Sequence, residues 1–321
     1  MFPEVHEQAM RRLAEVTGLV PVEYPTTRLV GAEPEARAAD VNAAFADPSI
    51  RAIIATIGGE DQILVIRHLD PEAARSDPKP FLGYSDNTHL HNWLWGNGIA
   101  SFYGGATQVH LGPGPYVDEV HARSLNAALV TGETLEITDP GVSEDVGIDW
   151  SDPRALEEFG DREATEPWRW SGPARSFTGP TWGGCLESID MLLVAGRLDA
   201  DPSVLDGAVL LLETSEELLP AHHVARIVRA LGERGLLAAV GAVLVARPPV
   251  SDHIHRPHDA ERDALRAEQG DLVRRVIRAY NRDAVACIGV PFGHTRPQRI
   301  LPHGGVITVD GASRTITADY A

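Results

Sequence analysis

Apolar residues recur every three to four positions in several segments of the chain, which is the spacing of one face of an α-helix. In residues 4–16, this face carries Val5, Met10, Leu13 and Val16. The same periodicity predicts further helices over residues 34–46, 61–69, 88 onward, 183–195, 222–234 and 259–281.

Short apolar runs separate these helices and predict buried strands. The runs cover residues 19–22, 52–57, 80–83, 99–103, 208–213, 237–246 and 286–290, and the tail predicts a β-hairpin that turns at Asp310–Gly311. Because helices alternate with strands, we expect an α/β fold with a mainly parallel sheet. Such a domain normally begins with a strand, whereas this chain begins within a helix. Either a first strand is missing ahead of residue 1, or the fold does without it.

A change of composition marks a boundary in the middle of the chain. Residues 139–182 are rich in proline, glycine and charged residues, as connecting segments often are. The 321 residues suffice for two domains with separate cores. We therefore expect an N-terminal domain over 1–165, a linker over 166–181 and a C-terminal domain over 182–321.

Composition and charge exclude several classes of protein. No apolar run reaches the roughly 18 residues that a membrane span needs, and the N-terminus lacks the apolar core of a signal peptide, so we expect a cytoplasmic protein. Cys185 and Cys287 have no CxxC spacing, which predicts two buried free thiols. Acidic residues outnumber basic ones 46 to 28, for a net charge of −18. Such a surface repels phosphate backbones, which makes nucleic acids and anionic membranes poor partners.

The stretch Phe81–Trp95 places a serine, Ser85, between the end of a predicted strand and the start of a predicted helix. A serine on such a turn can act as a nucleophile, because its hydroxyl projects from the backbone and free N–H groups of the helix lie nearby. Serine is also a favoured helix N-cap, and this stretch alone favours the cap.

Other strand ends carry polar residues that could share a site with Ser85. Ligands of open α/β sheets bind at the carboxyl ends of the strands. Gly58–Gly59, Glu213 and His294 each follow an apolar run. Serine, glutamate and histidine in this order match a hydrolytic triad, although the GxSxG motif of the alpha/beta-hydrolases is absent. Each residue also has an ordinary explanation, since a strand-end glutamate can cap a helix and a loop histidine is usually solvated.

Five short motifs stand in order along the chain: TIGG at 56–59, GYSD at 83–86, GGCL at 183–186, LLE at 211–213 and PFGH at 291–294. Together they resemble the LD-carboxypeptidase family of serine peptidases, which includes the microcin C immunity proteins. The resemblance spans residues 2–320. It implies a Rossmann-like N-terminal domain and a C-terminal mixed β/α domain with a barrel-like or swivelling sheet, with a cleft between them. It also implies a cytoplasmic, often dimeric enzyme that needs no metal or cofactor.

The resemblance assigns the catalytic triad to Ser85, Glu213 and His294. In this scheme His294 takes the proton of Ser85 as its hydroxyl attacks an amide carbonyl, and Glu213 orients the imidazole. Backbone N–H groups of Gly59 and Asp86 would stabilise the oxyanion.

The sequence also departs from the family pattern. The family usually begins with a strand and a Ser-Pro-rich turn that this sequence lacks, and murein carboxypeptidases typically have Arg-Gly-Gly-Tyr-Gly where this chain has TIGGED. The TIGG form is similar to the microcin immunity branch, which implies a peptidyl- or aminoacyl-nucleotide substrate contacted by Gly58. One tryptophan would then stack on adenine, and Trp168, Trp170 and Trp182 are the candidates, unless they are packing residues.

Three alternatives remain open at this point. A murein carboxypeptidase would release terminal D-Ala from a small cell-wall peptide. A metallohydrolase would use the DHIHRPHD segment at 252–259, although a solvated loop explains that segment better. A non-catalytic binding module would use the glycine turns to hold an anion at a helix N-terminus.

Overall fold

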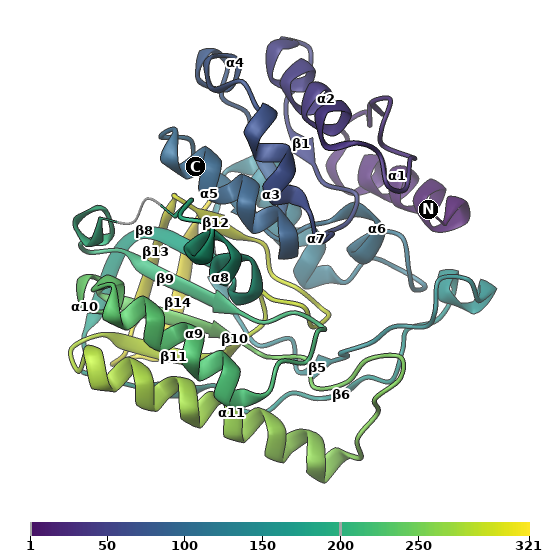
Figure 1. Ribbon diagram of the computed structural model, residues 1–321. Coiled ribbons are helices and arrows are strands. Elements are labelled where there is room, and N and C mark those ends of the chain that lie inside the picture. Colours follow the sequence, from purple (N-terminus) through teal and green to yellow (C-terminus); the bar gives the residue numbers. More distant parts are fainter. Residues whose placement is uncertain (1, 199–200) are drawn as a thin grey trace.

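The computed structural model describes residues 2–198 and 201–321, and within them the fold is α/β with two main sheets (Figure 1). The smaller sheet has the order β1-β2-β3-β12. Its strands are β1 Ile53–Ile54, β2 Phe81–Gly83, β3 Ser101–Tyr103 and β12 Leu301–His303. The first three are parallel, whereas β12 returns from the far end of the chain and pairs antiparallel with β3.

Helices of the N-terminal half surround this small sheet (Figure 1). They are α1 Pro3–Thr17, α2 Pro34–Ala46, α3 Gln62–Val65, α4 Pro71–Ser76, α5 Thr88–Gly96, α6 Thr107–His110 and α7 Glu119–Asn126. The predicted helices over 4–16 and 34–46 are confirmed. Both begin at a proline, which fits the first turn because that N–H has no partner within the helix. A short 3-10 turn, Ile66–His68, completes the predicted helix over 61–69.

The larger sheet has the order β4-β14-β13-β8-β9-β10-β11-β7. Its strands are β4 Thr134–Ile137, β7 Arg169–Ser171, β8 Ser176–Cys185, β9 Val209–Glu213, β10 Ala242–Ala246, β11 Val285–Val290, β13 Val306–Asp310 and β14 Thr315–Asp319. The neighbours β8, β9, β10 and β11 are parallel, and the outer strands are antiparallel. Every residue of β9 and β10 is buried, which explains why both read as continuous apolar runs.

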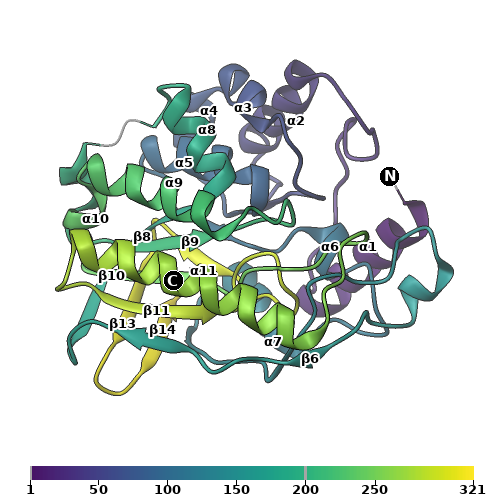
Figure 2. The same cartoon turned by 60° about the horizontal axis from the view of Figure 1, so that its bottom comes forward.

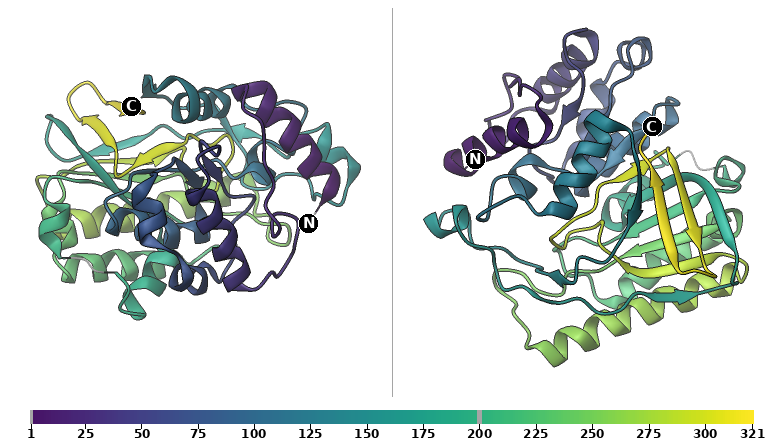
Figure 3. Two further views of the ribbon diagram at one scale, coloured as in Figure 1. Left: turned by 90° about the horizontal axis from the view of Figure 1, so that it is seen from above. Right: turned by 180° about the vertical axis from the view of Figure 1, so that it is seen from behind.

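Helices of the C-terminal half cover one face of this larger sheet (Figure 2). They are α8 Leu186–Val194, α9 Ala221–Glu233, α10 Leu236–Ala239 and α11 Asp259–Tyr280. The C-terminal hairpin β13–β14 lies behind the helices and pairs with β8 (Figure 3). None of the helices in the described ranges is both long and apolar enough to span a bilayer.

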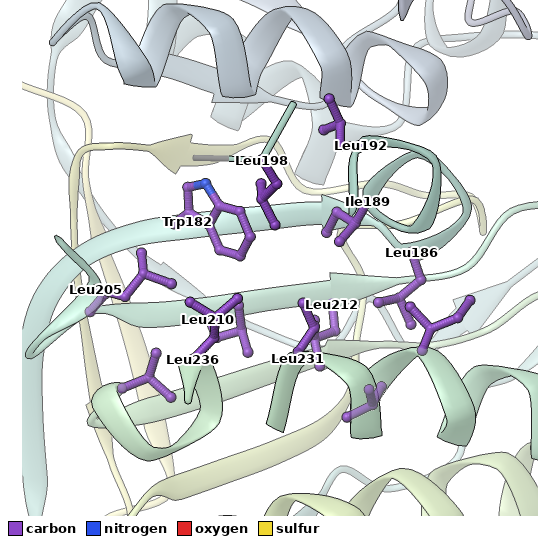
Figure 4. Close-up of a cluster of buried hydrophobic side chains, with 14 of the residues drawn as sticks. Trp182, Leu186, Ile189, Leu192, Leu198, Leu205, Leu210, Leu212, Leu231 and Leu236 are labelled. Carbon is purple, nitrogen blue, oxygen red and sulfur yellow. The ribbon is translucent and has the colours of Figure 1, made fainter. Parts of the chain in front are cut away.

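Apolar side chains from both halves of the chain meet in one core cluster. Leu90 and Leu94 of α5 belong to it together with Leu186 and Ile189 of α8. Figure 4 shows its C-terminal part, where Trp182 lies among leucines from β9 and the surrounding helices. The two halves therefore do not fold around wholly separate cores, although the predicted domain boundaries themselves remain a prediction.

Several expected elements differ in the structure. Residues 19–22 form no strand. A strand needs a neighbouring strand for its backbone hydrogen bonds, and a cavity separates these residues from residues 52–57. In the expected strand over 52–57, only Ile53 and Ile54 pair. Residues 236–239 form α10, so the predicted strand over 237–246 begins at Ala242. The hairpin turn is longer than predicted, occupying 311–314.

The predicted linker contains strands, and the helix predicted after it needs correction. Residues 166–181 include β7 and the first part of β8, and thus belong to the larger sheet. The segment before them carries the short pair β5 Val142–Ser143 and β6 Glu163–Ala164. The helix predicted over 183–195 begins only at Leu186, because 183–185 complete β8.

Candidate active site

Ser85 lies on a sharp turn between β2 and α5. Its φ of 62° is in the left-handed region, which a residue with a side chain enters only at an energetic cost of about 1–3 kcal/mol. A 3-10 turn, Ser85–Asn87, leads from this residue into α5. The hydroxyl makes no capping hydrogen bond to either helix in the described structure, so the N-cap interpretation is not supported. A strained strand–turn–helix geometry is typical of serine nucleophiles.

Tyr103, at the end of β3, connects the serine turn to the C-terminal half. Its hydroxyl accepts a hydrogen bond of 3.3 Å from the backbone N–H of Ser85 and donates one of 2.5 Å to Oε1 of Glu213. The ring is fully buried, and burial raises the pKa of Tyr103 well above its usual value. The phenol therefore stays neutral and can donate to the carboxylate.

Glu213, at the carboxyl end of β9, also binds His294. Its Oε2 lies 2.6 Å from Nδ1 of the imidazole, and both side chains are almost fully buried. The other ring nitrogen, Nε2, has no hydrogen-bond partner among the described residues and lies 3.3 Å from a carboxylate oxygen of Glu216. The ring also contacts Tyr84, the residue before the serine, with a centroid distance of 4.8 Å.

The charges around His294 determine its protonation. Burial lowers the pKa of this imidazole, but the Glu213 carboxylate, through its charge and its hydrogen bond, and the nearby Glu216 outweigh burial and raise the pKa to about 9. An imidazolium is thus stabilised at this position, as a base that accepts a proton during a reaction requires.

The glycine turn after β1 lies directly against Ser85. A Cβ on Gly58 would be 3.0 Å from the Cβ and 3.1 Å from the Oγ of Ser85. Only a glycine leaves the space beside the hydroxyl free. Gly59 lies against Asp86 instead, where a Cβ would be 3.3 Å from the carboxylate, and that carboxylate accepts a hydrogen bond of 2.8 Å from the N–H of Gln62 at the start of α3.

Two cavities adjoin this region. One has a volume of about 650 Å³, and Ser85, Asp86 and Gly59 form part of its wall, together with residues of α8, α9 and the loop after β9. The other, about 860 Å³, lies along the unpaired edge of β1 and is largely apolar. Because the serine opens into the smaller one, that cavity is the candidate substrate site.

The three candidate tryptophans do not line either cavity. Trp182 is 2% exposed, packs in the apolar cluster of Figure 4 and donates a hydrogen bond of 3.3 Å to Asn92. Trp168 and Trp170 are neighbours, with ring centroids 6.4 Å apart, and pack against a second apolar cluster that includes Leu244 and Cys287. In this conformation Trp182 is a packing residue.

The histidine-rich segment at 252–259 does not form a metal centre. Asp252 binds backbone N–H groups and the ring of His255 within its own exposed loop. Across residues 2–198 and 201–321, no three His, Cys, Asp or Glu side chains are placed to hold a metal ion.

Sequence reasoning missed four residues of the site. Tyr103 ends the strand next to the one that carries the serine turn, and this position could have identified it. Cys185 is buried and free, as expected, but it also lines the serine cavity. Glu187 and Glu216 had no signal in the sequence beyond following the GGCL and LLE motifs.

Comparison with known proteins adds the family context. Residues 2–104 match the LD-carboxypeptidase N-terminal domain and residues 178–309 the LD-carboxypeptidase C-terminal domain. A Vibrio cholerae protein named as a carboxypeptidase is 27% identical over 281 residues, 87% of this chain and 78% of that protein. The Escherichia coli microcin C7 self-immunity protein MccF is 23% identical over 287 residues, 88% of this chain and 77% of its own.

Solved structures show the same fold. Wild-type MccF without ligand superposes with a TM-score of 0.82 at 20% identity, covering 99% of this chain and 91% of that one. An MccF-like protein from Streptococcus pneumoniae, solved with AMP, gives a TM-score of 0.80 at 26% identity, covering 99% and 94%.

Proposed function

The chain belongs to the LD-carboxypeptidase family and is a hydrolase of the serine carboxypeptidase type, and we propose that Ser85, His294 and Glu213 form its catalytic triad. The observation that carries this proposal is the hydrogen-bonded series His294–Glu213–Tyr103–Ser85, which ties together three residues far apart in the sequence. The strained backbone of Ser85 supports it independently.

The proposed reaction is acyl transfer to serine followed by hydrolysis. Neutral His294 takes the Ser85 proton on Nε2, the nitrogen without a hydrogen-bond partner, while the hydroxyl oxygen attacks the amide carbonyl. Glu213 holds the proton on Nδ1 and stabilises the imidazolium that forms. The imidazolium then gives its proton to the leaving amine. In the second half, His294 takes a proton from the water that attacks the acyl-enzyme and returns it to Ser85 as the acyl group is released.

Negative charge on the carbonyl oxygen needs hydrogen-bond donors close to the serine. The backbone N–H groups of Asp86 and Gly59 are the proposed donors, and the Gly58 position leaves room for the substrate beside Ser85. One donor of this kind contributes on the order of 10²- to 10³-fold in rate.

We propose an aminoacyl- or peptidyl-nucleotide as substrate. MccF has been solved with aspartyl sulfamoyl adenosine, and the Streptococcus pneumoniae protein with AMP, which supports a nucleotide-linked acyl group here. A murein peptide that ends in D-Ala is the second candidate, because the family models are those of LD-carboxypeptidases.

Replacement of the serine tests the proposal. We expect Ser85→Ala to abolish hydrolysis of aminoacyl-sulfamoyl adenosines or murein L,D-peptides and to abolish labelling by a fluorophosphonate probe, with unchanged circular dichroism. The matched control is Ser151→Ala, at an exposed serine far along the chain, which should keep both activities. Turnover by Ser85→Ala at the wild-type rate would refute the triad.

A homodimer and a cytoplasmic location are part of the same proposal, both drawn from the family resemblance. Sedimentation equilibrium should then give twice the chain mass of 34.6 kDa. Cell fractionation should recover the protein with the cytoplasmic markers.

A further inference from the structure

The loop that carries His294 is largely buried, although it forms no helix or strand of its own. It covers residues 291–299, between β11 and β12, and we call it the histidine loop. Backbone groups in a buried loop need hydrogen-bond partners from elsewhere, because no strand ladder supplies them. The contacts that hold this loop therefore determine where the imidazole lies.

The side chain of Gln298 spans the histidine loop from within. It is fully buried, and its Nε2 donates a hydrogen bond of 2.9 Å to the carbonyl oxygen of Gly293, the residue before His294. Its Oε1 accepts a hydrogen bond of 2.9 Å from the backbone N–H of Gly105, in the turn after β3. One side-chain amide thus joins the peptide beside the imidazole to the N-terminal half of the chain.

The peptide that Gln298 holds also lies directly against Glu213. A Cβ on Gly293 would be 3.0 Å from both the Cβ and the Oε2 of Glu213. The same Oε2 lies 2.6 Å from Nδ1 of His294. Because the imidazole is attached to the next residue along the chain, a displacement of the Gly293 carbonyl would change the distance between the carboxylate and the ring.

The turn after β3 connects the histidine loop to the other parts of the proposed triad. Tyr103, whose hydroxyl bonds to the serine turn and to Glu213, lies two residues before Gly105. A Cβ on Gly104, between them, would be 2.9 Å from Oε1 of Gln298, and its φ of 125° is a conformation that glycine adopts without strain. The same short turn therefore contacts the serine, glutamate and histidine segments.

Other contacts attach the later part of the histidine loop. The N–H of Arg299 and the side chain of Arg296 both form hydrogen bonds there. Among the described residues, however, the Gln298 amide makes the only hydrogen bond to the backbone of residues 293 and 294. The position of the imidazole thus depends on this amide more than on the arginines.

We propose that Gln298 is a positioning residue of the candidate site, which sets the place of the His294 imidazole relative to Glu213 and to the serine turn. The inference rests on the proposed function, because a displaced imidazole slows catalysis only if His294 is the base. Gln298 acts through the Gly293 carbonyl and not on the reacting atoms. Its loss should therefore lower the rate of proton transfer more than the affinity for substrate.

Gln298→Met tests this, because it removes the amide and keeps the length of the side chain. With a sulfamoyl adenosine or murein L,D-peptide that the unmodified protein cleaves, we expect kcat to fall by about 10- to 100-fold and KM to change by less than about 3-fold. Gln8→Met is the matched control. Gln8 of α1 also donates to backbone carbonyls, those of Gly112 and Leu156, but neither belongs to the candidate site, so kcat should be unchanged.

Proton NMR tests the geometry without a substrate. A proton on Nδ1 of His294, in a hydrogen bond of 2.6 Å to a buried carboxylate, should give a resonance far downfield, and its absence in Glu213→Gln would assign it. We expect this resonance to shift upfield or disappear in Gln298→Met and to stay in Gln8→Met. Gln298→Asn, whose amide is one CH₂ too short to reach both partners, should act in the same direction and serves if Gln298→Met does not fold.

The outcomes distinguish this inference from the proposed triad. If Gln298→Met has the kcat of the unmodified protein, or if its resonance is unshifted, the positioning role is overturned while the triad stands. An equal fall of kcat in Gln8→Met would also overturn it, because the effect would then be general. Turnover by Ser85→Ala would refute the nucleophile, whereas the resonance would still report whether Gln298 places His294 beside Glu213.

Discussion

At the scale of single residues, the site is governed by the carboxylates around one imidazole. Glu213 holds Nδ1 of His294, and Glu216 lies 3.3 Å from Nε2, the nitrogen that the proposed reaction needs free. A pKa of about 9 means that the free enzyme carries an imidazolium at neutral pH. In the proposed reaction, Glu216 would thus compete with Ser85 for the imidazole.

The pH dependence of kcat/KM should reflect the protonation of His294. Because the base must be neutral, kcat/KM should rise with pH with a midpoint near pH 9. Glu216→Gln removes a charge that raises the pKa of His294, so the midpoint should move to lower pH, whereas Glu133→Gln, exposed and absent from the cavity wall, should not move it. An acid limb with a midpoint below pH 7 in the unmodified enzyme would contradict the assigned charge environment.

The same pKa predicts how stability depends on pH. The folded pKa of about 9 lies above the reference value of 6.5, so the imidazolium favours folding. This contribution is complete below about pH 6.5 and is lost as pH rises through 9. Urea denaturation at pH 6.5 and 9.5 should show a smaller pH-dependent loss of stability in Glu213→Gln than in the unmodified protein.

Gly58 offers a steric test at the same scale. Gly58→Ala places a methyl group 3.1 Å from the Ser85 hydroxyl, and we expect kcat/KM to fall by about 10²-fold, as for a small displacement of reacting groups. Gly147→Ala is the control, since no atom lies within 4 Å of its added Cβ. Activity of Gly58→Ala near that of the control would show that this space is not used by the substrate.

At the scale of elements, β8 determines how the two sheets and the site fit together. The strand pairs with β9 on one side and β13 on the other, and ends at Cys185 in the serine cavity. Gly183 has a φ of 137°, and a Cβ there would lie 1.9 Å from the carbonyl oxygen of Leu211. The sequence predicted Gly183 at the start of a helix, but a glycine is required here because β8 packs closely against β9.

Alanine substitution should distinguish a glycine that close packing requires from one with open space around it. Gly183→Ala should destabilise the protein by at least about 3 kcal/mol, because it combines backbone strain with a clash against β9. Gly96→Ala, at the end of α5 with no atom near its added Cβ, should change stability by no more than about 1 kcal/mol and in the stabilising direction. Thermal denaturation of the two variants measures the contrast, and equal melting temperatures would refute the packing argument.

At the scale of the whole molecule, buried ion pairs attach the segment before β7 to the C-terminal sheet. Arg247 bonds to Asp145, Glu163 and Glu166, and Arg266 bonds to the same three carboxylates. Arg247 and Asp145 are each 3% exposed, so neither charge can be left without a partner cheaply.

Removal of one charge should therefore be costly. Arg247→Met leaves Asp145 with one cation fewer, and we expect a loss of about 3–5 kcal/mol in the free energy of unfolding. The double variant Arg247→Met with Asp145→Asn should recover part of that loss, because the excess buried charge is gone. Chemical denaturation of the unmodified protein, Arg247→Met, Asp145→Asn and the double variant tests this, and simple additivity of the two substitutions would contradict a coupled network.

The sequence by itself determined the α/β class, the long helices and the strands β9 and β11, because apolar periodicity and burial dictate them locally. It also predicted Ser85, Glu213 and His294 as a triad, from the apolar strands that they follow and from the family resemblance, and that triad stays a prediction. Only the tertiary structure decided what lies between these residues. Tyr103 and Glu187 reach the site through strand order and helix packing, and contacts over such sequence distances leave no periodic trace in the chain. The role of Gly183 and the burial of Trp182 were likewise decided by neighbours from other elements.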